Sequence, residues 1–278
     1  MKQYAFRILN VFAREGRLTG NPLCVFEDGT GLDDASMQAL ARQFNLSETT
    51  FVLPSQKATA QVRIFTPSYE MPFAGHPTLG TAHVVREIRS AGDSLTLEMK
   101  AGIIPVSAKG DRWTLQANPP KSRAVTLADA ELAEILGLDA GDIAPTPMRV
   151  SIGREQLLVP VKSVEAVRRA RPRADIFQRL SGDDGPGQAY VFADSGDAVE
   201  SRFFFTSGSA ILEDPATGSA CANLGGWFLA TKPGAEVERT VSQGEMVSRP
   251  STLYLSVKAG VIRVSGNVIE LARGTLAL

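Results

Sequence analysis

One short motif occurs twice in this chain, and the repeat restricts the folds that the chain can adopt. The pattern Pro-x-x-Gly-[Ser/Thr]-Ala stands at 77–82 and again at 215–220. A short apolar segment that is typical of a strand precedes each copy, at 63–66 and at 202–206. The repeat therefore predicts that one strand, loop and helix unit is used twice, and that the chain folds into two similar halves.

Both copies are typical of a helix start. Pro215 suits the first helical position, where a missing N–H costs nothing, and Asp214 before it is a typical N-cap. The small residues at 217–219 leave the amides of the first turn uncovered, so an anion could bind there. Aligning the copies places His76 where Asp214 stands in the second copy.

Size and charge limit the class of protein. A chain of 278 residues with 44% apolar residues and a net charge of -1 is expected to be a soluble globular protein, long enough for two domains. It lacks the basic excess that would indicate a nucleic-acid partner. No stretch is long and apolar enough to span a bilayer. Arg7 and Asn10 interrupt the N-terminal apolar residues, which argues against a signal peptide and predicts a cytoplasmic protein.

The residues that bind metals are scarce. Cys24 and Cys221 are too few for a disulfide framework or a cysteine-based metal site, and only His76 and His83 could add imidazole ligands. The sequence contains neither a Walker-type loop nor a dinucleotide glycine fingerprint. The sequence therefore disfavours a metal enzyme and shows no motif for a nucleotide cofactor.

The order of elements predicts an α+β fold. Helices are expected from a cap at Asp33 or Asp34 to Asn45, over 79–88, over 130–136 with Gly137 as C-cap, and from Asp214 to about Ala230. Most of the remaining segments are typical of strands, including 46–53, 260–265 and 268–271, whereas 182–187 is expected to be a loop. A linker at 118–122 divides the chain into halves 1–118 and 119–278, each expected to wrap a curved sheet around one central helix.

Glu48 is an acid on a largely apolar strand face. Alternation along the strand 46–53 places Glu48 with Leu46, Thr50 and Val52. A glutamate in a strand is usually only a solvated edge residue. This one stands in the segment 45–49, which carries part of a resemblance to a known family.

The chain resembles the phenazine-biosynthesis PhzF-like isomerases, which share their fold with diaminopimelate epimerase. The matching segments are Gly20-Asn21-Pro22, Asn45-Leu46-Ser47-Glu48-Thr49, Phe65-Thr66-Pro67, Phe73-Ala74-Gly75-His76-Pro77-Thr78-Leu79-Gly80, Asp214-Pro215-Ala216-Thr217-Gly218-Ser219-Ala220, Gln243-Gly244 and Arg249-Pro250-Ser251. The resemblance implies two domains, each with a mixed sheet curled around a central helix, and a cleft between them. It also implies that the last strand can return to the first domain, and that the protein is a homodimer.

The resemblance assigns roles to individual residues. It implies that Glu48 transfers the proton, and that His76 and Asp214 hold the substrate and set the charge balance of the site. The alternatives are that His76 only caps a helix and that Asp214 is an ordinary N-cap. The substrate-binding residues implied are Ser47, Gly75, Gly218 and Ser219, which could otherwise be no more than turn and capping residues.

Two features depart from related patterns. Ser248 stands where the PhzF-like family usually has glycine, and a serine would be strained there if the backbone needs a positive φ. The epimerase relatives use two cysteines as acid and base, whereas neither helix start here has a cysteine at that position. Two-thiol epimerisation is therefore disfavoured.

The resemblance implies a cofactor-independent isomerase that moves a proton between carbons of a small carboxylate-bearing substrate. Glu48, His76 and Asp214 are its expected catalytic residues. The alternative is a catalytically silent binding or interaction protein of the same fold. A hydrolase is a weaker possibility, because no serine stands in a nucleophile-elbow Gly-x-Ser-x-Gly context.

Overall fold

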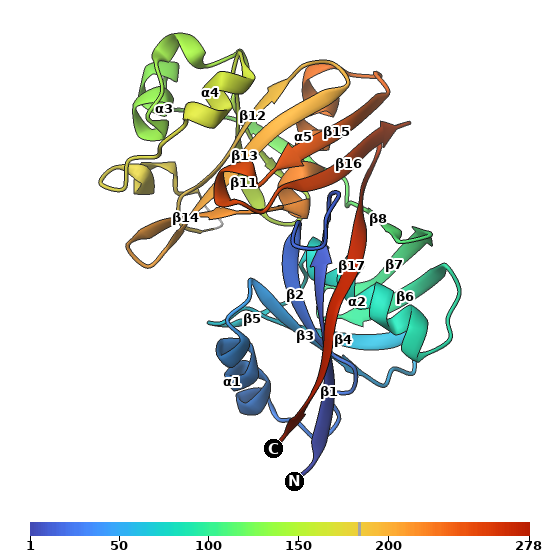
Figure 1. Cartoon of the computed structure of the whole chain (residues 1–278). Helices are drawn as coiled ribbons and strands as arrows, with labels where there is room; N and C mark the ends of the chain where they lie inside the picture. The colour runs from blue at the N-terminus through green and yellow to red at the C-terminus, as the bar shows by residue number, and fades with distance from the viewer. Residues whose placement is uncertain (183–184) are drawn as a thin grey trace. The chain divides into compact units, whose positions relative to one another are not determined.

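A computed structural model describes residues 1–182 and 185–278, so the middle of the loop expected at 182–187 lies outside the described residues. The chain forms two compact units, of which unit 1 is Met1–Gln116 with Ser265–Leu278 and unit 2 is Ala117–Val264 (Figure 1). Both units combine strands with helices, so the expected two-domain α+β fold is confirmed. No helix in the described part of the chain has the length and hydropathy that a membrane span requires.

Unit 1 contains two helices and eight complete strands. These are β1 (Gln3–Val11), β2 (Asn21–Phe26), α1 (Asp34–Phe44), β3 (Glu48–Leu53), β4 (Ala60–Phe65), β5 (Glu70–Met71), α2 (Gly75–Ile88), β6 (Ser94–Met99), β7 (Gly102–Lys109) and β8 (Arg112–Gln116). The helix α2 packs against β1, β2, β3 and β8, whereas α1 packs against β3 and β4.

Unit 2 contains three helices and eight complete strands within its described residues. These are β9 (Lys121–Ala124), α3 (Asp129–Leu136), β10 (Met148–Ser151), β11 (Glu155–Pro160), α4 (Val164–Arg169), β12 (Gln188–Asp194), β13 (Ala198–Ser207), β14 (Ala210–Asp214), α5 (Gly218–Thr231), β15 (Val237–Gln243) and β16 (Ser251–Lys258). Short 3-10 turns occupy η1 (Ala140–Asp142), η2 (Phe177–Leu180) and η3 (Glu245–Val247).

Both units use the same succession of strand pairings. In unit 1, β2 is parallel to β3, β3 is antiparallel to β4, and β4 pairs antiparallel with β5 and parallel with β6. In unit 2, β11 is parallel to β12, β12 is antiparallel to β13, and β13 pairs antiparallel with β14 and parallel with β15. The repeated unit is thus larger than the short sequence motif, and it places α2 and α5 at corresponding points of the chain order.

The last strand, β17 (Val261–Ala277), begins in unit 2 and continues in unit 1. It pairs antiparallel with β1, from Gln3 opposite Ala277 to Val11 opposite Val268. The expected division after residue 118 assigns 265–278 to the C-terminal half. In the structure these residues belong to unit 1, because they pair with β1. The two strands expected at 260–265 and 268–271 are one continuous strand. The expected linker at 118–122 also differs, because its last two residues begin β9, which pairs with β10.

Local signals explain α1 well. Asp33 caps the helix by accepting a hydrogen bond from the Ser36 amide, and Asn45 ends it in the left-handed conformation with a φ of 51°. Between these caps Met37, Leu40 and Ala41 are buried, as the helical spacing predicts.

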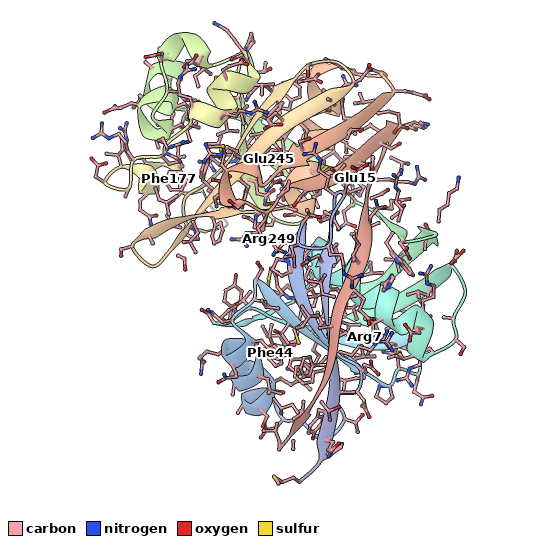
Figure 2. The ribbon with its side chains drawn as sticks, viewed as in Figure 1. Arg7, Glu15, Phe44, Phe177, Glu245 and Arg249 are labelled. Atoms are coloured by element: carbon pink, nitrogen blue, oxygen red, sulfur yellow. The ribbon has the colours of Figure 1, made fainter. Side chains whose placement is uncertain are left out.

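Arg7 is the buried centre of an ionic cluster in unit 1, whose three glutamates are partly exposed. Its guanidinium donates to Glu27 at 2.6 Å, to Glu87 at 2.6 Å and to Glu270 at 2.9 Å, while the Arg7 side chain is only 2% exposed. Figure 2 labels Arg7 beside α2 and β17. Because Glu87 belongs to α2 and Glu270 to β17, the cluster ties the helix and the last strand to β1.

Candidate active site

Glu48 and His76 meet in unit 1. Glu48 is the first residue of β3 and His76 the second residue of α2, and Oε2 of Glu48 lies 3.3 Å from Nδ1 of His76. The two side chains are 15% and 6% exposed. The structure therefore brings together, from positions 28 residues apart, an acid and an imidazole that the sequence analysis expects to be catalytic.

The strand register explains why Glu48 points towards α2. β3 runs parallel to β2, with Leu23 opposite Glu48. Thr50, two residues further and on the same face, makes a 2.8 Å hydrogen bond with Thr81 of α2. On the other face of the strand, Phe51 and Leu53 pack with residues of α1. The face that carries Glu48 is thus the face that α2 covers.

Burial keeps the His76 imidazole neutral. It lowers the pKa of His76 from 6.5 to about 3, and a hydrogen bond to the Pro22 carbonyl opposes this only in part. The contact with Glu48 is therefore one between a carboxyl group and a neutral imidazole rather than an ion pair. Among the described residues, no hydrogen-bond partner meets the buried Nε2 atom of His76.

Replacing His76 with glutamine should make the protein less sensitive to acid. Below pH 6.5 the unfolded chain binds a proton at His76 while the folded protein does not, so the free energy of unfolding falls as the pH falls. The wild type should lose about 2 kcal/mol from this residue between pH 6.5 and 5, since one pKa unit corresponds to about 1.4 kcal/mol. Urea unfolding of both proteins from pH 8 to 5 measures the difference.

His83→Gln is the matched control. Burial also lowers the pKa of His83, but this side chain is less enclosed than His76. Its replacement should therefore change the pH dependence less. Parallel curves for the wild type and His76→Gln would show that His76 is not held neutral.

The Gly20-Asn21-Pro22 segment supports the pair. The Pro22 carbonyl accepts from His76, and the hydroxyl of the exposed Ser47 donates to Oδ1 of the buried Asn21 at 3.1 Å. The sequence alone indicates no catalytic or binding role for Asn21 or Pro22. The signal that could have indicated one is the presence of this segment among those that carry the family resemblance.

The start of α2 has no side-chain cap. Ala74 is its N-cap residue, and the first turn carries no acidic side chain. Gly80, one turn along, has no room for a Cβ atom, which would lie 2.5 Å from Leu23 and 2.8 Å from Val11. The helix therefore lies close to β1 and β2, and its first-turn amides, including that of Gly75, are not covered by a capping side chain.

Asp214, Gly218 and Ser219 lie together in unit 2. Asp214 ends β14, and its Oδ2 accepts a 2.5 Å hydrogen bond from the Thr217 hydroxyl. Gly218 and Ser219 are the first two residues of α5, whose N-cap Thr217 makes no side-chain capping bond and whose first turn has no acid.

The expected helix starts are wrong in detail. α5 begins at Gly218, so Pro215 is not its first residue and Asp214 is not its N-cap. α2 begins at Gly75, which makes Pro77 its third residue. The fixed φ of proline also suits an extended segment before a helix, so the residue alone does not locate the first turn.

His76 and Asp214 do not occupy equivalent positions, contrary to the alignment of the two motif copies. His76 lies inside α2, whereas Asp214 is in a strand that precedes its helix. Asp214 pairs with Phe203 as Met71 pairs with Ile64, so the hairpins match Asp214 with Met71. Strand register, which a six-residue motif does not record, decides the correspondence.

Gln243 fixes the segment between β14 and α5. Its amide nitrogen donates to the Asp214 carbonyl at 2.8 Å and to the Thr217 hydroxyl at 3.0 Å, and its oxygen accepts from the Thr217 amide at 3.3 Å. Gly244 follows with a φ of 85°, and a Cβ there would lie 2.5 Å from the Pro215 carbonyl oxygen. The conformation of the Asp214 segment is therefore set from β15.

Ser248 stands where the family usually has glycine, and its backbone is in the left-handed conformation. Its φ is 56° and its ψ is 29°. This conformation is less favourable for a serine than for a glycine, and the strain falls in the loop after η3 rather than on Glu48, His76 or Asp214.

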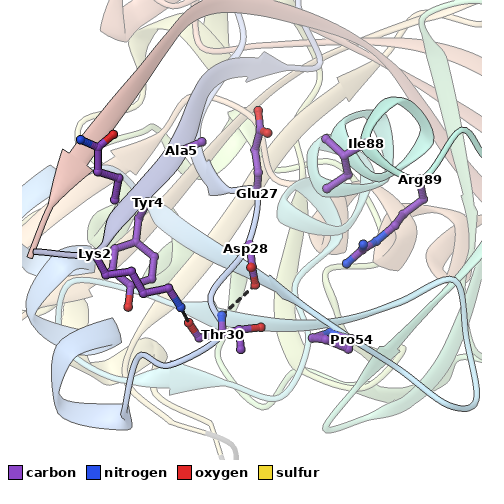
Figure 3. Close-up of a pocket in the computed structure, with 10 residues that line it drawn as sticks. Lys2, Tyr4, Ala5, Glu27, Asp28, Thr30, Pro54, Ile88 and Arg89 are labelled. Carbon is purple, nitrogen blue, oxygen red and sulfur yellow. Dashed lines mark hydrogen bonds between the residues drawn. The ribbon is translucent and has the colours of Figure 1, made fainter.

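A separate pocket lies at the other end of α2. It has a volume of about 370 Å³ and is lined by residues that include Tyr4, Asp28, Ile88 and Arg89 (Figure 3). Ile88 ends α2, and a 14-residue helix is about 20 Å long, so this pocket is far from His76. It contains no residue expected to be catalytic. No three His, Cys, Asp or Glu side chains of the described segments are grouped as a metal site requires.

Comparisons with known proteins agree on one family. The sequence profile described as phenazine biosynthesis-like protein matches residues 9–274. The chain is 37% identical to an uncharacterized isomerase of Pasteurella multocida, over 98% of this chain and 94% of that protein. It is 33% identical to a trans-2,3-dihydro-3-hydroxyanthranilate isomerase of Pseudomonas aeruginosa, over 98% of each. A crystal structure of a PhzF-family phenazine biosynthesis protein from Bacillus anthracis superposes with a TM-score of 0.87 at 26% identity and covers 100% of both chains.

Proposed function

The chain belongs to the phenazine biosynthesis-like protein family and is an isomerase, and we propose that it moves a proton between two carbon atoms of a small carboxylate-bearing substrate. The contact between Glu48 and the buried, neutral His76 carries this proposal. An enclosed carboxylate beside a neutral imidazole can accept a proton and return it.

In this mechanism Glu48 removes a proton from one substrate carbon. The electron pair of the broken C–H bond enters the π-system of the substrate, and the double bond shifts. Glu48 then returns the proton to a second carbon, so the reaction needs no net oxidation or reduction. His76 holds the Glu48 carboxyl group in place without adding a positive charge, because burial keeps the imidazole neutral.

The helix starts provide the proposed carboxylate-binding groups. The first turn of α2 contributes Gly75, and that of α5 contributes Gly218 and Ser219; neither turn contains an acid that would repel an anion. Ser47 and Asp214 complete the proposed set, with Asp214 helping to hold the substrate and to set the charge balance of the site. Roles for these residues stay predictions from the family resemblance and the local geometry.

The relative from Pseudomonas aeruginosa supplies a first substrate to test, trans-2,3-dihydro-3-hydroxyanthranilate. The protein is incubated in D₂O with this compound and with a panel of other small unsaturated carboxylates, and products are followed by NMR. Isomerisation with deuterium at the new C–H position is expected for at least one compound. A protein that binds a carboxylate but exchanges no proton would instead be the silent binding protein.

Replacing either cysteine with alanine should leave turnover near the wild-type rate. Cys24 and Cys221 are fully buried, and burial raises the pKa of both thiols, so neither is a ready proton carrier. Cys221 lies in the body of α5 rather than at its start. Rates are compared at a temperature where each variant is folded by circular dichroism, and loss of activity in a folded variant would indicate thiol chemistry.

We also propose that the protein is a homodimer, which the family resemblance implies. Sedimentation at micromolar concentration distinguishes a dimer from a monomer.

A further inference from the structure

A line of buried amide side chains in unit 2 ends at the hydroxyl of Ser219. Nδ2 of Asn223 donates to the Arg154 carbonyl oxygen at 3.2 Å and to Oε1 of Gln156 at 2.8 Å. Nε2 of Gln156 then donates to Oγ of Ser219 at 3.1 Å. Asn223 is 0% exposed and Gln156 2%, so water does not compete for these bonds. We name this line the amide chain.

The backbone carbonyl of Arg154 sets the direction of the amide chain. A carbonyl oxygen can only accept, so Asn223 must present its nitrogen to it. The same nitrogen contacts Gln156, which must therefore present its oxygen to Asn223 and its nitrogen to Ser219. The Ser219 oxygen consequently accepts a hydrogen bond, and its proton remains to be donated elsewhere. Among the described residues, none accepts that proton.

This arrangement leaves one polar atom of Asn223 unsatisfied. Its Oδ1 atom is buried without a hydrogen-bond partner in the described part of the chain. An unpaired buried acceptor is unfavourable. The fold thus keeps the direction of the amide chain even though one buried oxygen has no partner.

Ser47 contrasts with Ser219. The Ser47 hydroxyl donates to Oδ1 of Asn21, so its proton is already used within the protein. Of the two serines proposed to bind substrate, only Ser219 keeps its proton available.

We propose that Gln156 and Asn223 are positioning residues that reserve the Ser219 hydroxyl proton for a carboxylate oxygen of the substrate. The inference rests on the proposed function, which places a substrate carboxylate at the start of α5. It makes Ser219, and not Ser47, the hydroxyl that distinguishes a carboxylate from a neutral group. The positive end of the α5 dipole favours the same charge.

Gln156→Glu tests the direction of the amide chain. The two side chains have the same shape, but an ionised carboxylate can only accept, so the Ser219 hydroxyl would turn to the introduced carboxylate and be lost to the ligand. The probe is 3-hydroxyanthranilate, and its affinity is measured by calorimetry. Gln156→Glu and Ser219→Ala should each weaken binding about 10- to 100-fold, the range for a hydrogen bond to a charged group. The amide counterpart, 3-hydroxyanthranilamide, should be affected much less.

Gln156→Met is the matched control, because methionine removes the donor but leaves the Ser219 hydroxyl free to rotate. Its effect should be only a few-fold. Lowering the pH should restore binding to Gln156→Glu, since a protonated acid can donate again, and should not restore it to Gln156→Met.

The introduced carboxylate at position 156 could also weaken binding by repelling the ligand. The double variant Gln156→Glu with Ser219→Ala separates this repulsion from the effect of the hydroxyl direction. If the hydroxyl direction matters, Gln156→Glu adds little to the loss already caused by Ser219→Ala. An equal loss in both backgrounds would mean repulsion alone and would overturn the proposal.

A ligand-free measurement keeps this inference separate from the proposed function. A neutron structure of the deuterated full chain should show a Gln156 deuteron directed at Ser219 Oγ. A Ser219 deuteron directed at Gln156 would overturn the inference, whatever the substrate. A wild type that binds carboxylates but converts none of them would refute the proposed function alone.

Discussion

Replacing Glu48 with glutamine should abolish proton transfer while the fold and most of the ligand affinity remain. Glutamine preserves the size of the side chain and can still contact Nδ1 of His76, which lies 3.3 Å from Oε2 of Glu48. It cannot take up a proton and return it. General acid–base catalysis contributes ~100- to 10,000-fold, so the rate should fall by at least that order with little change in binding.

The measurement is deuterium exchange and isomerisation on one substrate by wild type and variant, with binding followed by calorimetry. Glu236→Gln, at an exposed position in unit 2, is the control for a lost carboxylate and should keep full activity. A Glu48→Gln protein that binds ligand and still exchanges near the wild-type rate would show that another group carries the proton. His76 or Asp214 would then be the leading candidate.

Replacing Arg7 with methionine should cost about 1–3 kcal/mol of unfolding free energy, the usual range for leaving hydrogen-bonded groups without their partner, because the three glutamates that remain are partly exposed to water. The variant leaves Glu27, Glu87 and Glu270 without the guanidinium that contacts all three. Urea unfolding measures the loss. Hydrogen exchange should also show weaker protection in 265–277, because Glu270 holds the last strand to this cluster.

Arg273→Met provides a close control. Arg273 contacts Glu87 and Glu270 as Arg7 does, but its side chain is 54% exposed. Exposed ion pairs typically contribute below about 1 kcal/mol, so this variant should be nearly as stable as the wild type. Equal effects of the two replacements would show that burial of Arg7 is not what makes the cluster strong.

Local chemistry let the sequence predict several elements correctly. Asp33 and Asn45 are strong caps in any context, so the limits of α1 could be predicted from single residues. Gly137 ends α3 in the left-handed conformation for the same kind of reason. Alternation along β3 placed Glu48 on the face of Thr50, which contacts α2. Each of these predictions depends on neighbours within a few residues.

Helix starts were harder to predict, because proline fits both the first turn of a helix and the extended segment before it. Pro77 stands inside α2 and Pro215 before α5, although both motif copies have the same pattern. The hairpins β4–β5 and β13–β14 decide where each helix begins, and their turns differ in length. The sequence motif could therefore indicate a repeat without giving its register.

The sequence by itself determined the two motif copies and the caps of α1 and α3. It also determined the acid, the imidazole and the small residues that form the candidate site. Only the tertiary structure decided which of them meet: Glu48 with His76, and Ser219 with Gln156, 63 residues away. Gln156 is followed by four apolar residues of the same strand, which indicates burial of this segment but gives no partner for the amide. The reason is physical, since the direction of a buried hydrogen bond depends on strand register and on distant backbone carbonyls such as that of Arg154, which no local pattern records.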